Sequence, residues 1–137
     1  MNRSEPGTLD TTTGATTLDE IHTVLEAFWL AHPDVPEGIR LRVGIATAEI
    51  GANIVEHAGR GESIRLRMET RAHPDTIEIV FTDDGWGAEV DLTAVHLPDD
   101  MAERSRGLAL ARSVLGELSY RRDGTTNCWI LISERFG

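Results

Sequence analysis

The sequence predicts an α+β fold, a two-layer α/β sandwich in which a mixed, mainly antiparallel sheet lies against three helices. Two observations favour it. Apolar residues recur at helical spacing in the first part of the chain, and they alternate in two later pairs of short segments. We find no internal repeat and no dividing linker, so one domain is expected over residues 17–137, after a flexible segment or a short first strand within residues 1–16.

Two helices are predicted in the first part of the chain. The first covers residues 18–31, with Thr17 as its N-cap and Glu20 closing a capping box. The second covers Glu37–His57 and follows Pro36, a residue suited to a first helical turn. Its apolar residues form two stripes on nearly opposite sides, which predicts a largely buried helix.

The other regular elements are shorter. Residues 83–106 form a connection too long to be passive in a small domain, so we expect a functional or mobile loop there. The predicted elements are a strand at Thr8–Thr12, hairpin strands at 64–69 and 77–81, a helix at 107–118, and closing strands at 119–122 and 127–133 about an Asp123-Gly124 turn.

Composition excludes several classes of function. The net charge of −10 opposes direct nucleic-acid binding, and no apolar run approaches the roughly 18 residues of a membrane span. All 13 basic residues are Arg, so a P-loop lysine is absent, and the single cysteine, Cys128, permits no intrachain disulfide. The N-terminus lacks the pattern of a secretory signal, which makes a cytoplasmic location the expectation.

The first candidate site motif lies in the second predicted helix. Glu49 and Asn53 are four residues apart, so both side chains lie on one helix face. A carboxylate and an amide oxygen in this arrangement suit Mg²⁺, which takes one or two protein oxygens beside substrate phosphates. The alternative is a solvated polar stripe in which Arg42 pairs with Glu49.

The second motif follows the strand predicted to end at Phe81-Thr82. Gly85 and Gly87 would let the backbone approach a ligand closely, and Asp83 could accept a hydrogen bond from an exocyclic amine. The alternative is a plain turn, because Asp-Gly is also a common turn signal.

Two further motifs lie near the C-terminus. Arg104, Arg106 and Gly107 belong to a basic segment that opens a predicted helix, where free amides and the helix dipole favour an anion. The alternative is a flexible loop with solvated arginines. Gly124-Thr125-Thr126 precedes the last strand, and a threonine hydroxyl there could reach a ligand or serve the turn.

The order and spacing of these motifs resemble the GHKL ATP-binding superfamily, in particular the anti-sigma-factor serine kinases. The E-x-x-x-N motif of that family is matched at Glu49–Asn53, D-x-G-x-G at Asp83–Gly87, the lid-to-helix motif at Arg106–Leu110, and G-T-T at Gly124–Thr126. The resemblance covers the chain from Thr17 onward. The family usually has a second glycine where this chain has Ala109.

The resemblance implies a GHKL (histidine-kinase-like) ATP-binding fold with ATP and Mg²⁺ as cofactors. It implies that Asp83 recognises the adenine amine with Thr126 near the same base, that Asn53 holds Mg²⁺, and that Glu49 is the catalytic base. A lid formed by residues 88–106 would close over the nucleotide. The phosphates would be bound by the segment containing Arg104, Arg106, Gly107, Leu108 and Ala109.

The function that the resemblance implies is ATP-dependent phosphorylation of an anti-anti-sigma protein, coupled to sequestration of a sigma factor, by a homodimer. The alternative is a non-catalytic binding module whose shape ATP controls, and Ala109 favours it. A histidine-kinase catalytic fragment is a third interpretation, weakened because the chain carries no phospho-acceptor helix pair. Neither nucleic acid nor a membrane is an expected partner.

Overall fold

The computed structural model of the protein describes residues 7–87 and 102–137, with side chains from residue 106 onward in the second range. Its elements are β1 (Thr8–Thr12), α1 (Thr17–Ala31), α2 (Glu37–Asn53), a π-helical turn η1 (Ile54–Ala58), β2 (Arg65–Ala72), β3 (Ile77–Asp83), α3 (Ala102–Ser113), β4 (Glu117–Asp123) and β5 (Thr126–Ile132). The described residues contain no helix long and apolar enough to cross a membrane.

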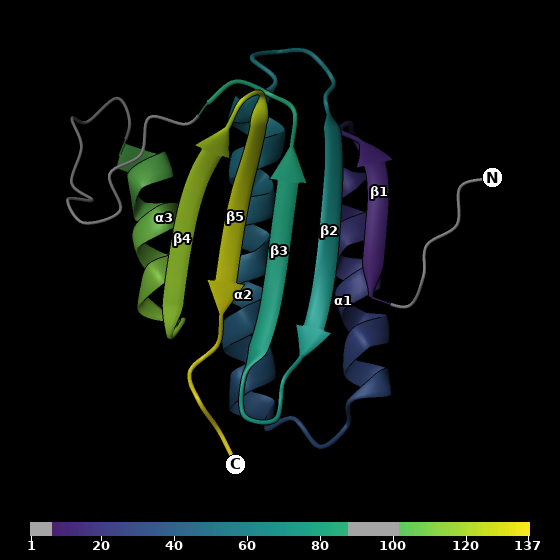
Figure 1. Ribbon diagram of the computed structural model, residues 1–137, viewed down its shortest axis with the longest axis vertical. Helices are drawn as coiled ribbons and strands as arrows, with labels where there is room; N and C mark the ends of the chain where they lie inside the picture. Colours follow the sequence, from purple (N-terminus) through teal and green to yellow (C-terminus); the bar gives the residue numbers. More distant parts are fainter. Residues whose placement is uncertain (1–6, 88–101) are drawn as a thin grey trace.

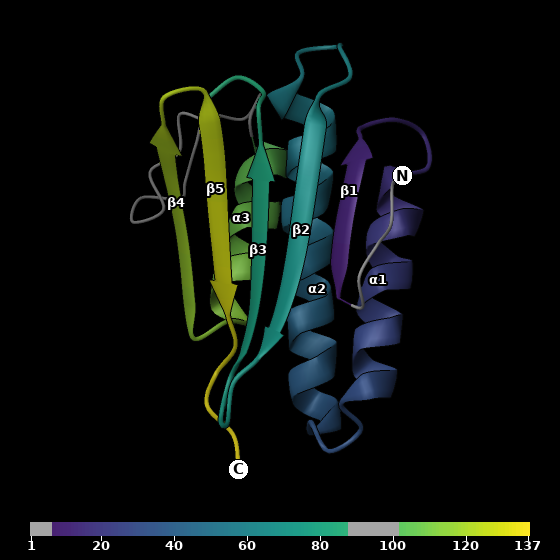
Figure 2. The same cartoon turned by 45° about the vertical axis from the view of Figure 1, so that its right-hand side comes forward.

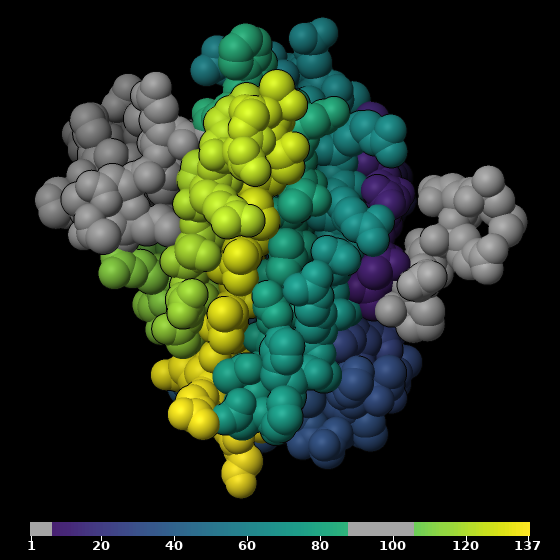
Figure 3. All heavy atoms as spheres, in the orientation of Figure 1, coloured from purple at the N-terminus to yellow at the C-terminus, as the bar shows by residue number. Residues whose placement is uncertain are grey.

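The sheet has the strand order β1-β2-β3-β5-β4, and each neighbouring pair in it is antiparallel. The prediction of a mixed sheet is therefore wrong for these five strands. The predicted α+β two-layer sandwich is confirmed, because α1, α2 and α3 all lie on one face of the sheet (Figure 1; Figure 2). None of the helices in the described ranges covers the opposite face (Figure 3).

The core fills the space between the helices and the inner face of the sheet. Alternate residues of β3 and β5 point inward, while α2 contributes the apolar stripe that faces them. The apolar core residues of these three elements are Ile39, Val43, Ala46, Ile50, Ile77, Ile79, Phe81, Trp129 and Leu131. Burial of this stripe fixes the rotation of α2, and with it the direction of the polar residues near its end.

The start of α1 differs from the predicted capping box. The N-cap residue is Thr16, without a side-chain capping bond, and Thr17 is buried with its hydroxyl accepting a hydrogen bond from the Gly14 amide. The Glu20 carboxylate accepts instead from the Thr11 hydroxyl, 3.1 Å away. Thr17 therefore anchors the preceding loop, and Glu20 ties α1 to β1.

The second predicted helix is divided in two. α2 ends at Asn53, and Ile54–Ala58 continues it as a π-helical turn, a form that often occurs at functional sites. Only one of its two apolar stripes is buried, because α2 lies between α1 and α3 in a single layer and its outer side meets solvent. Leu41, from the other stripe, is 64% exposed.

The third helix starts and ends earlier than predicted. α3 covers Ala102–Ser113 instead of 107–118, so Gly107 lies well inside it. The helix ends early because the chain joins the sheet: Gly116 donates its amide hydrogen to the Ile132 carbonyl, 2.9 Å away, and β4 begins at the next residue. The closing hairpin has the predicted position, with Asp123 paired to Thr126 and Gly124 at φ 61° in the turn.

Candidate functional site

The predicted site motifs converge on one end of the molecule. Figure 1 shows, at its upper end, the end of α2, the end of β3, the start of α3 and the turn between β4 and β5. These four segments are distant in sequence. The antiparallel pairing of β3 with β5 and the packing of α2 against α3 bring them together.

Asp83 is the last residue of β3 and is only 4% exposed. Its Oδ1 accepts hydrogen bonds from the Gly85 amide at 2.9 Å and from Nδ2 of Asn127 at 2.8 Å. Its Oδ2 is buried and has no hydrogen-bond partner among the residues that the structure describes. A buried acceptor without a donor costs about 1–3 kcal/mol, and a ligand that supplies an N–H group removes this cost.

Burial also raises the pKa of Asp83 above its ordinary value of 3.8. The hydrogen bonds from Asn127 and Gly85 lower the pKa again, while the neighbouring Asp84 carboxylate raises it and the Arg122 guanidinium lowers it. Desolvation is the largest of these effects. The charged form of Asp83 is thus held in the fold at a cost, which is typical of functional carboxylates.

The loop after Asp83 is packed tightly against the end of η1. A Cβ atom on Gly85 would lie 2.5 Å from the Ala58 carbonyl oxygen, so no side chain fits there. The Trp86 amide donates to the same carbonyl at 2.8 Å, and the Arg60 guanidinium lies 4.3 Å from the centroid of the Trp86 ring. At Gly87 a Cβ atom would lie 3.0 Å from Cδ of Arg122. Both glycines therefore permit close packing within the protein, and their role in the approach to a ligand stays a prediction.

Glu49 and Gly107 are in direct contact across the α2–α3 interface. A Cβ atom on Gly107 would collide with Oε1 of the half-buried Glu49 side chain. The missing side chain of Gly107 therefore makes room for the proposed catalytic carboxylate. Close α2–α3 packing thus explains a glycine in mid-helix, where it costs roughly 0.5–1 kcal/mol relative to alanine.

The predicted anion site at a helix start is wrong in its placement. Gly107 follows the first turn of α3, and only the first four amides of a helix lack an intrahelical partner. Arg104 belongs to that first turn, but its side chain is outside the described part of the chain, as are residues 88–101 of the predicted lid. Next to Gly107, Arg106 is exposed, Leu108 is buried in the core and Ala109 is half-buried.

Asn53 is the last residue of α2, one helical turn beyond Glu49, and is 8% exposed. The described residues contain no group of three or more His, Cys, Asp and Glu side chains that could hold a metal ion. A carboxylate and an amide one turn apart nevertheless fit Mg²⁺, since this ion takes few protein oxygens and shares the ligand's phosphates. Bound there, Mg²⁺ would neutralise phosphate charge.

A hollow of about 210 Å³ joins Asp83 to Thr126. The other residues that line it are Asp10, Arg65, Leu66, Arg67, Thr82 and Asp84. The structure thus places Asp83 and Thr126 around one hollow, and Glu49 and Gly107 in a separate contact. A larger hollow, about 770 Å³, lies between α1 and α2 and contains none of the predicted site residues.

The family of the chain follows from its comparison with known domains. The family model of the histidine kinase-like ATPase domain matches residues 12–132. The chain belongs to this family. A comparison with curated proteins gives no match.

A solved structure shows the same fold for this histidine kinase-like ATPase domain. The histidine kinase domain of a blue-light activated histidine kinase from Erythrobacter litoralis EL346 superposes with a TM-score of 0.58 at 19% sequence identity. The match covers 85% of this chain and 60% of the other chain. The α+β fold with its antiparallel sheet is therefore that of a histidine kinase-like ATPase.

The sequence analysis did not identify three residues of the hydrogen-bond network that reaches Asp83. Asn127 touches Asp83 directly, and both Tyr120 and Arg122 bond to Asn127. A signal for Asn127 existed, because it shares the inward row of β5 with Trp129 and Leu131, where a polar residue is unexpected.

The Glu49–Gly107 contact gives a first prediction. Gly107→Ala should stabilise α3 by about 0.5–1 kcal/mol, because alanine is the better helix former, while its methyl group displaces the flexible end of Glu49. We therefore expect a higher unfolding midpoint. If Glu49 is the catalytic base of a phosphate transfer, we also expect that transfer to fall by about 10-fold or more, because a misplaced base acts poorly. Thermal unfolding and a labelled-phosphate assay measure the two effects. Unchanged transfer would contradict the predicted role of Glu49 as the catalytic base.

Proposed function

We propose that the protein is an ATP-dependent serine kinase and anti-sigma factor, which phosphorylates an anti-anti-sigma protein and sequesters a sigma factor. The observation that carries the nucleotide part is the buried Oδ2 of Asp83, which has no partner within the described part of the chain, in a domain of the ATPase family. The kinase part rests on Glu49 and on the resemblance of the four sequence motifs to the anti-sigma kinases.

Asp83 supports adenine as the base. An ionised carboxylate only accepts hydrogen bonds, and the exocyclic amine of adenine donates them. Guanine presents a carbonyl oxygen at the same ring position, which would face Oδ2 without a hydrogen between them. Thr126, on the same hollow, offers a hydroxyl that can donate or accept.

Glu49 supports proton transfer from a hydroxyl acceptor. Its carboxylate lies against Gly107, within the segment that the resemblance assigns to phosphate binding. A carboxylate there can accept or orient the proton of an incoming serine hydroxyl as its oxygen attacks the terminal phosphorus. Arg106, which is exposed on α3 next to Gly107, can approach the charge of the phosphates.

The partners follow from the resemblance alone. The acceptor would be a serine of an anti-anti-sigma protein, and the sequestered protein a sigma factor, with a homodimer acting in the cytoplasm. Phosphorylation of the antagonist would release the kinase to hold the sigma factor.

A second candidate is a non-catalytic binding module gated by ATP. Ala109 favours it, since the family usually has glycine at this position. The structure places Ala109 inside α3, where alanine is the best helix former, so the substitution suits the helix even if it costs turnover.

The distinguishing experiment is transfer of labelled phosphate from ATP to a serine of candidate antagonists from the same organism. The wild-type protein should label one of them, and Ala109→Gly should do so at least as fast. If the wild type is silent and Ala109→Gly is active, the binding-module function is correct. If both are silent while ATP binds, the kinase function is wrong.

A further inference from the structure

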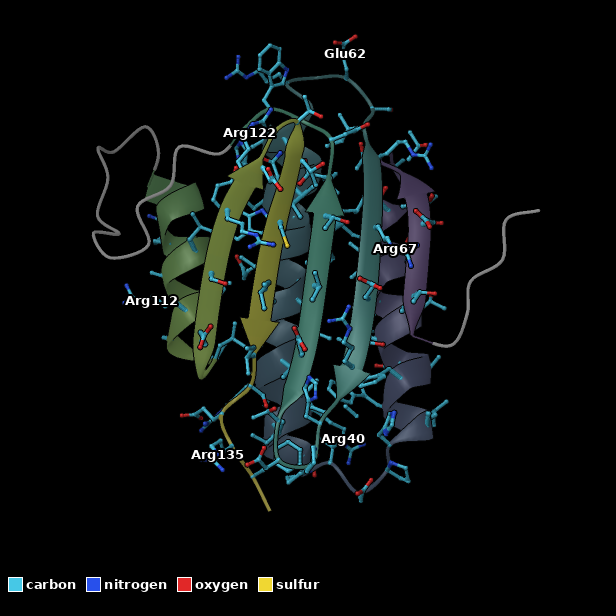
Figure 4. The ribbon with its side chains drawn as sticks, viewed as in Figure 1. Arg40, Glu62, Arg67, Arg112, Arg122 and Arg135 are labelled. Atoms are coloured by element: carbon cyan, nitrogen blue, oxygen red, sulfur yellow. The ribbon has the colours of Figure 1, made fainter. Side chains whose placement is uncertain are left out.

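Asn127 is a buried residue at the centre of a partly buried hydrogen-bond network beside the proposed adenine site. It lies opposite Asp83 in the β3–β5 pairing and is 1% exposed. Its partners come from three segments: Asp83 on β3, the loop after β3, and Tyr120 and Arg122 on β4. Figure 4 shows Arg122 near the upper end of β4, at the same end of the sheet as the β4–β5 turn.

The orientation of the Asn127 amide is fixed by its neighbours. Arg122 Nη1 lies 2.8 Å from Asn127 Oδ1, and the Tyr120 hydroxyl lies 2.6 Å from it. A guanidinium can only donate, so the atom facing it must be the amide oxygen. The amide nitrogen therefore faces Asp83.

The amide nitrogen then holds both the carboxylate and the loop. Nδ2 donates to Asp83 Oδ1 at 2.8 Å, to the Trp86 carbonyl at 3.0 Å and to the Gly85 carbonyl at 3.2 Å. Arg122 Nη1 donates to the same Gly85 carbonyl at 3.0 Å. The carboxylate is thereby fixed with Oδ1 occupied.

We propose that Asn127 is a positioning residue that sets the base selectivity of the nucleotide site, by occupying Oδ1 of Asp83 so that only Oδ2 remains as an acceptor for a 6-aminopurine. This inference rests on the proposed ATP site. It adds a residue outside the four motifs and assigns the selectivity to the Tyr120–Arg122–Asn127 network.

The physical reason is that a carboxyl group without this donor could serve either purine. A free carboxyl group can rotate, and once protonated it can donate to the 6-oxo group of a 6-oxopurine. Asn127 opposes both changes, because its N–H group stabilises the ionised form in one orientation. With the network intact, a 6-oxopurine meets an acceptor only.

The test compares ATP with inosine triphosphate, which carries a 6-oxo group in place of the amine. Asn127→Leu keeps similar volume and removes all donors. Since a buried substitution can impair folding, a second variant is Arg122→Met, at an exposed residue whose loss frees the amide to turn. The matched control is Arg121→Met, which removes the same charge from the other face of β4.

By calorimetry, the wild type should prefer ATP over inosine triphosphate. Asn127→Leu should reduce this preference by about 10-fold or more, the scale of one hydrogen bond to a charged group, and Arg122→Met should reduce it less. Arg121→Met should keep the wild-type preference. If all four proteins prefer ATP over inosine triphosphate to the same degree, the inference is overturned. If the wild type binds neither nucleotide, the proposed function is overturned instead.

The pH dependence of ATP affinity separates positioning from general loosening. The charged groups that act on the Asp83 carboxyl are Asp84 in its own loop and Arg122 on β4, while Arg65 and Arg67 on β2 and Asp10 on β1 line the hollow that Asp83 also borders. Affinity should fall as the pH drops through the pKa of Asp83. Loss of the Asn127 donor raises that pKa, so in Asn127→Leu the fall should begin at higher pH. If the substitution only loosened the site and let water in, the fall in ATP affinity would begin at lower pH, and that outcome would overturn the inference.

Discussion

Asp83→Asn is expected to weaken ATP binding by about 100-fold or more, the largest effect on binding that the structure predicts. The variant keeps an acceptor for Asn127 and the Gly85 amide, but it places an amide N–H₂ group where Oδ2 was. Two donors, the amide and the adenine amine, would then face each other. Calorimetric titration with ATP and Mg²⁺ measures the loss.

The same variant should be at least as stable as the wild type at neutral pH. Because burial raises the pKa of Asp83 above 3.8, folding favours its neutral form, which asparagine mimics. The stability that the wild type gains from this raised pKa is fully present below pH 3.8, the ordinary pKa of the carboxyl group. It is lost as the pH rises through the pKa that Asp83 has in the folded protein. The stability difference in favour of Asp83→Asn should therefore widen with pH over that window, as measured by denaturant unfolding.

The control for both effects is Asp84→Asn, which removes the neighbouring charge from an exposed side chain. Its ATP affinity should stay within about 3-fold of the wild type, because an asparagine oxygen can still accept the Arg65 amide bond that Asp84 accepts. Full ATP affinity in Asp83→Asn would show that the base is recognised elsewhere.

Glu49→Gln is expected to reduce phosphate transfer by about 100-fold or more while ATP affinity stays within about 3-fold. Glutamine keeps the shape and reach of glutamate beside Gly107 but lacks its basicity. Labelled-phosphate incorporation into the antagonist serine measures transfer, and calorimetry measures affinity.

Glu56→Gln is the matched control, since it makes the same charge change at an exposed residue of η1. It should transfer phosphate at the wild-type rate. If Glu49→Gln does so as well, Glu49 is not the base, and the contact with Gly107 is only structural. Should the wild type lack transfer, the comparison is made in the Ala109→Gly background.

The strands and their hairpins were predictable because their signals are local, whereas the all-antiparallel pairing of the sheet was not. Alternation placed Ile77, Ile79 and Phe81 on one face of a strand, and the Asp123-Gly124 pair located the last turn. The limits of α3 were not predictable from local signals. In the sequence, Gly107 resembles a helix boundary. Its position inside α3 is explained only by its contact with Glu49, which lies on another helix.

The motifs of the site were predictable from the sequence, whereas the hydrogen-bond network that connects them was not. Asp83 was identified through its glycines, but its unpaired oxygen depends on which partners reach Oδ1. Those partners come from β5 and the loop after β3, so only the strand pairing reveals them. Asn127 could have been suspected as a polar residue in a buried row, whereas its orientation depends on Arg122.

The central claim, that this domain binds ATP through Asp83, is tested most directly by calorimetric titration of the wild-type protein with ATP and Mg²⁺ up to about 1 mM. We predict saturable binding in the micromolar range. At a ligand concentration of about 100 times Kd, this would stabilise the fold by about 2.7 kcal/mol and raise its unfolding midpoint by several degrees. An absence of both binding heat and thermal stabilisation at 1 mM would contradict the claim.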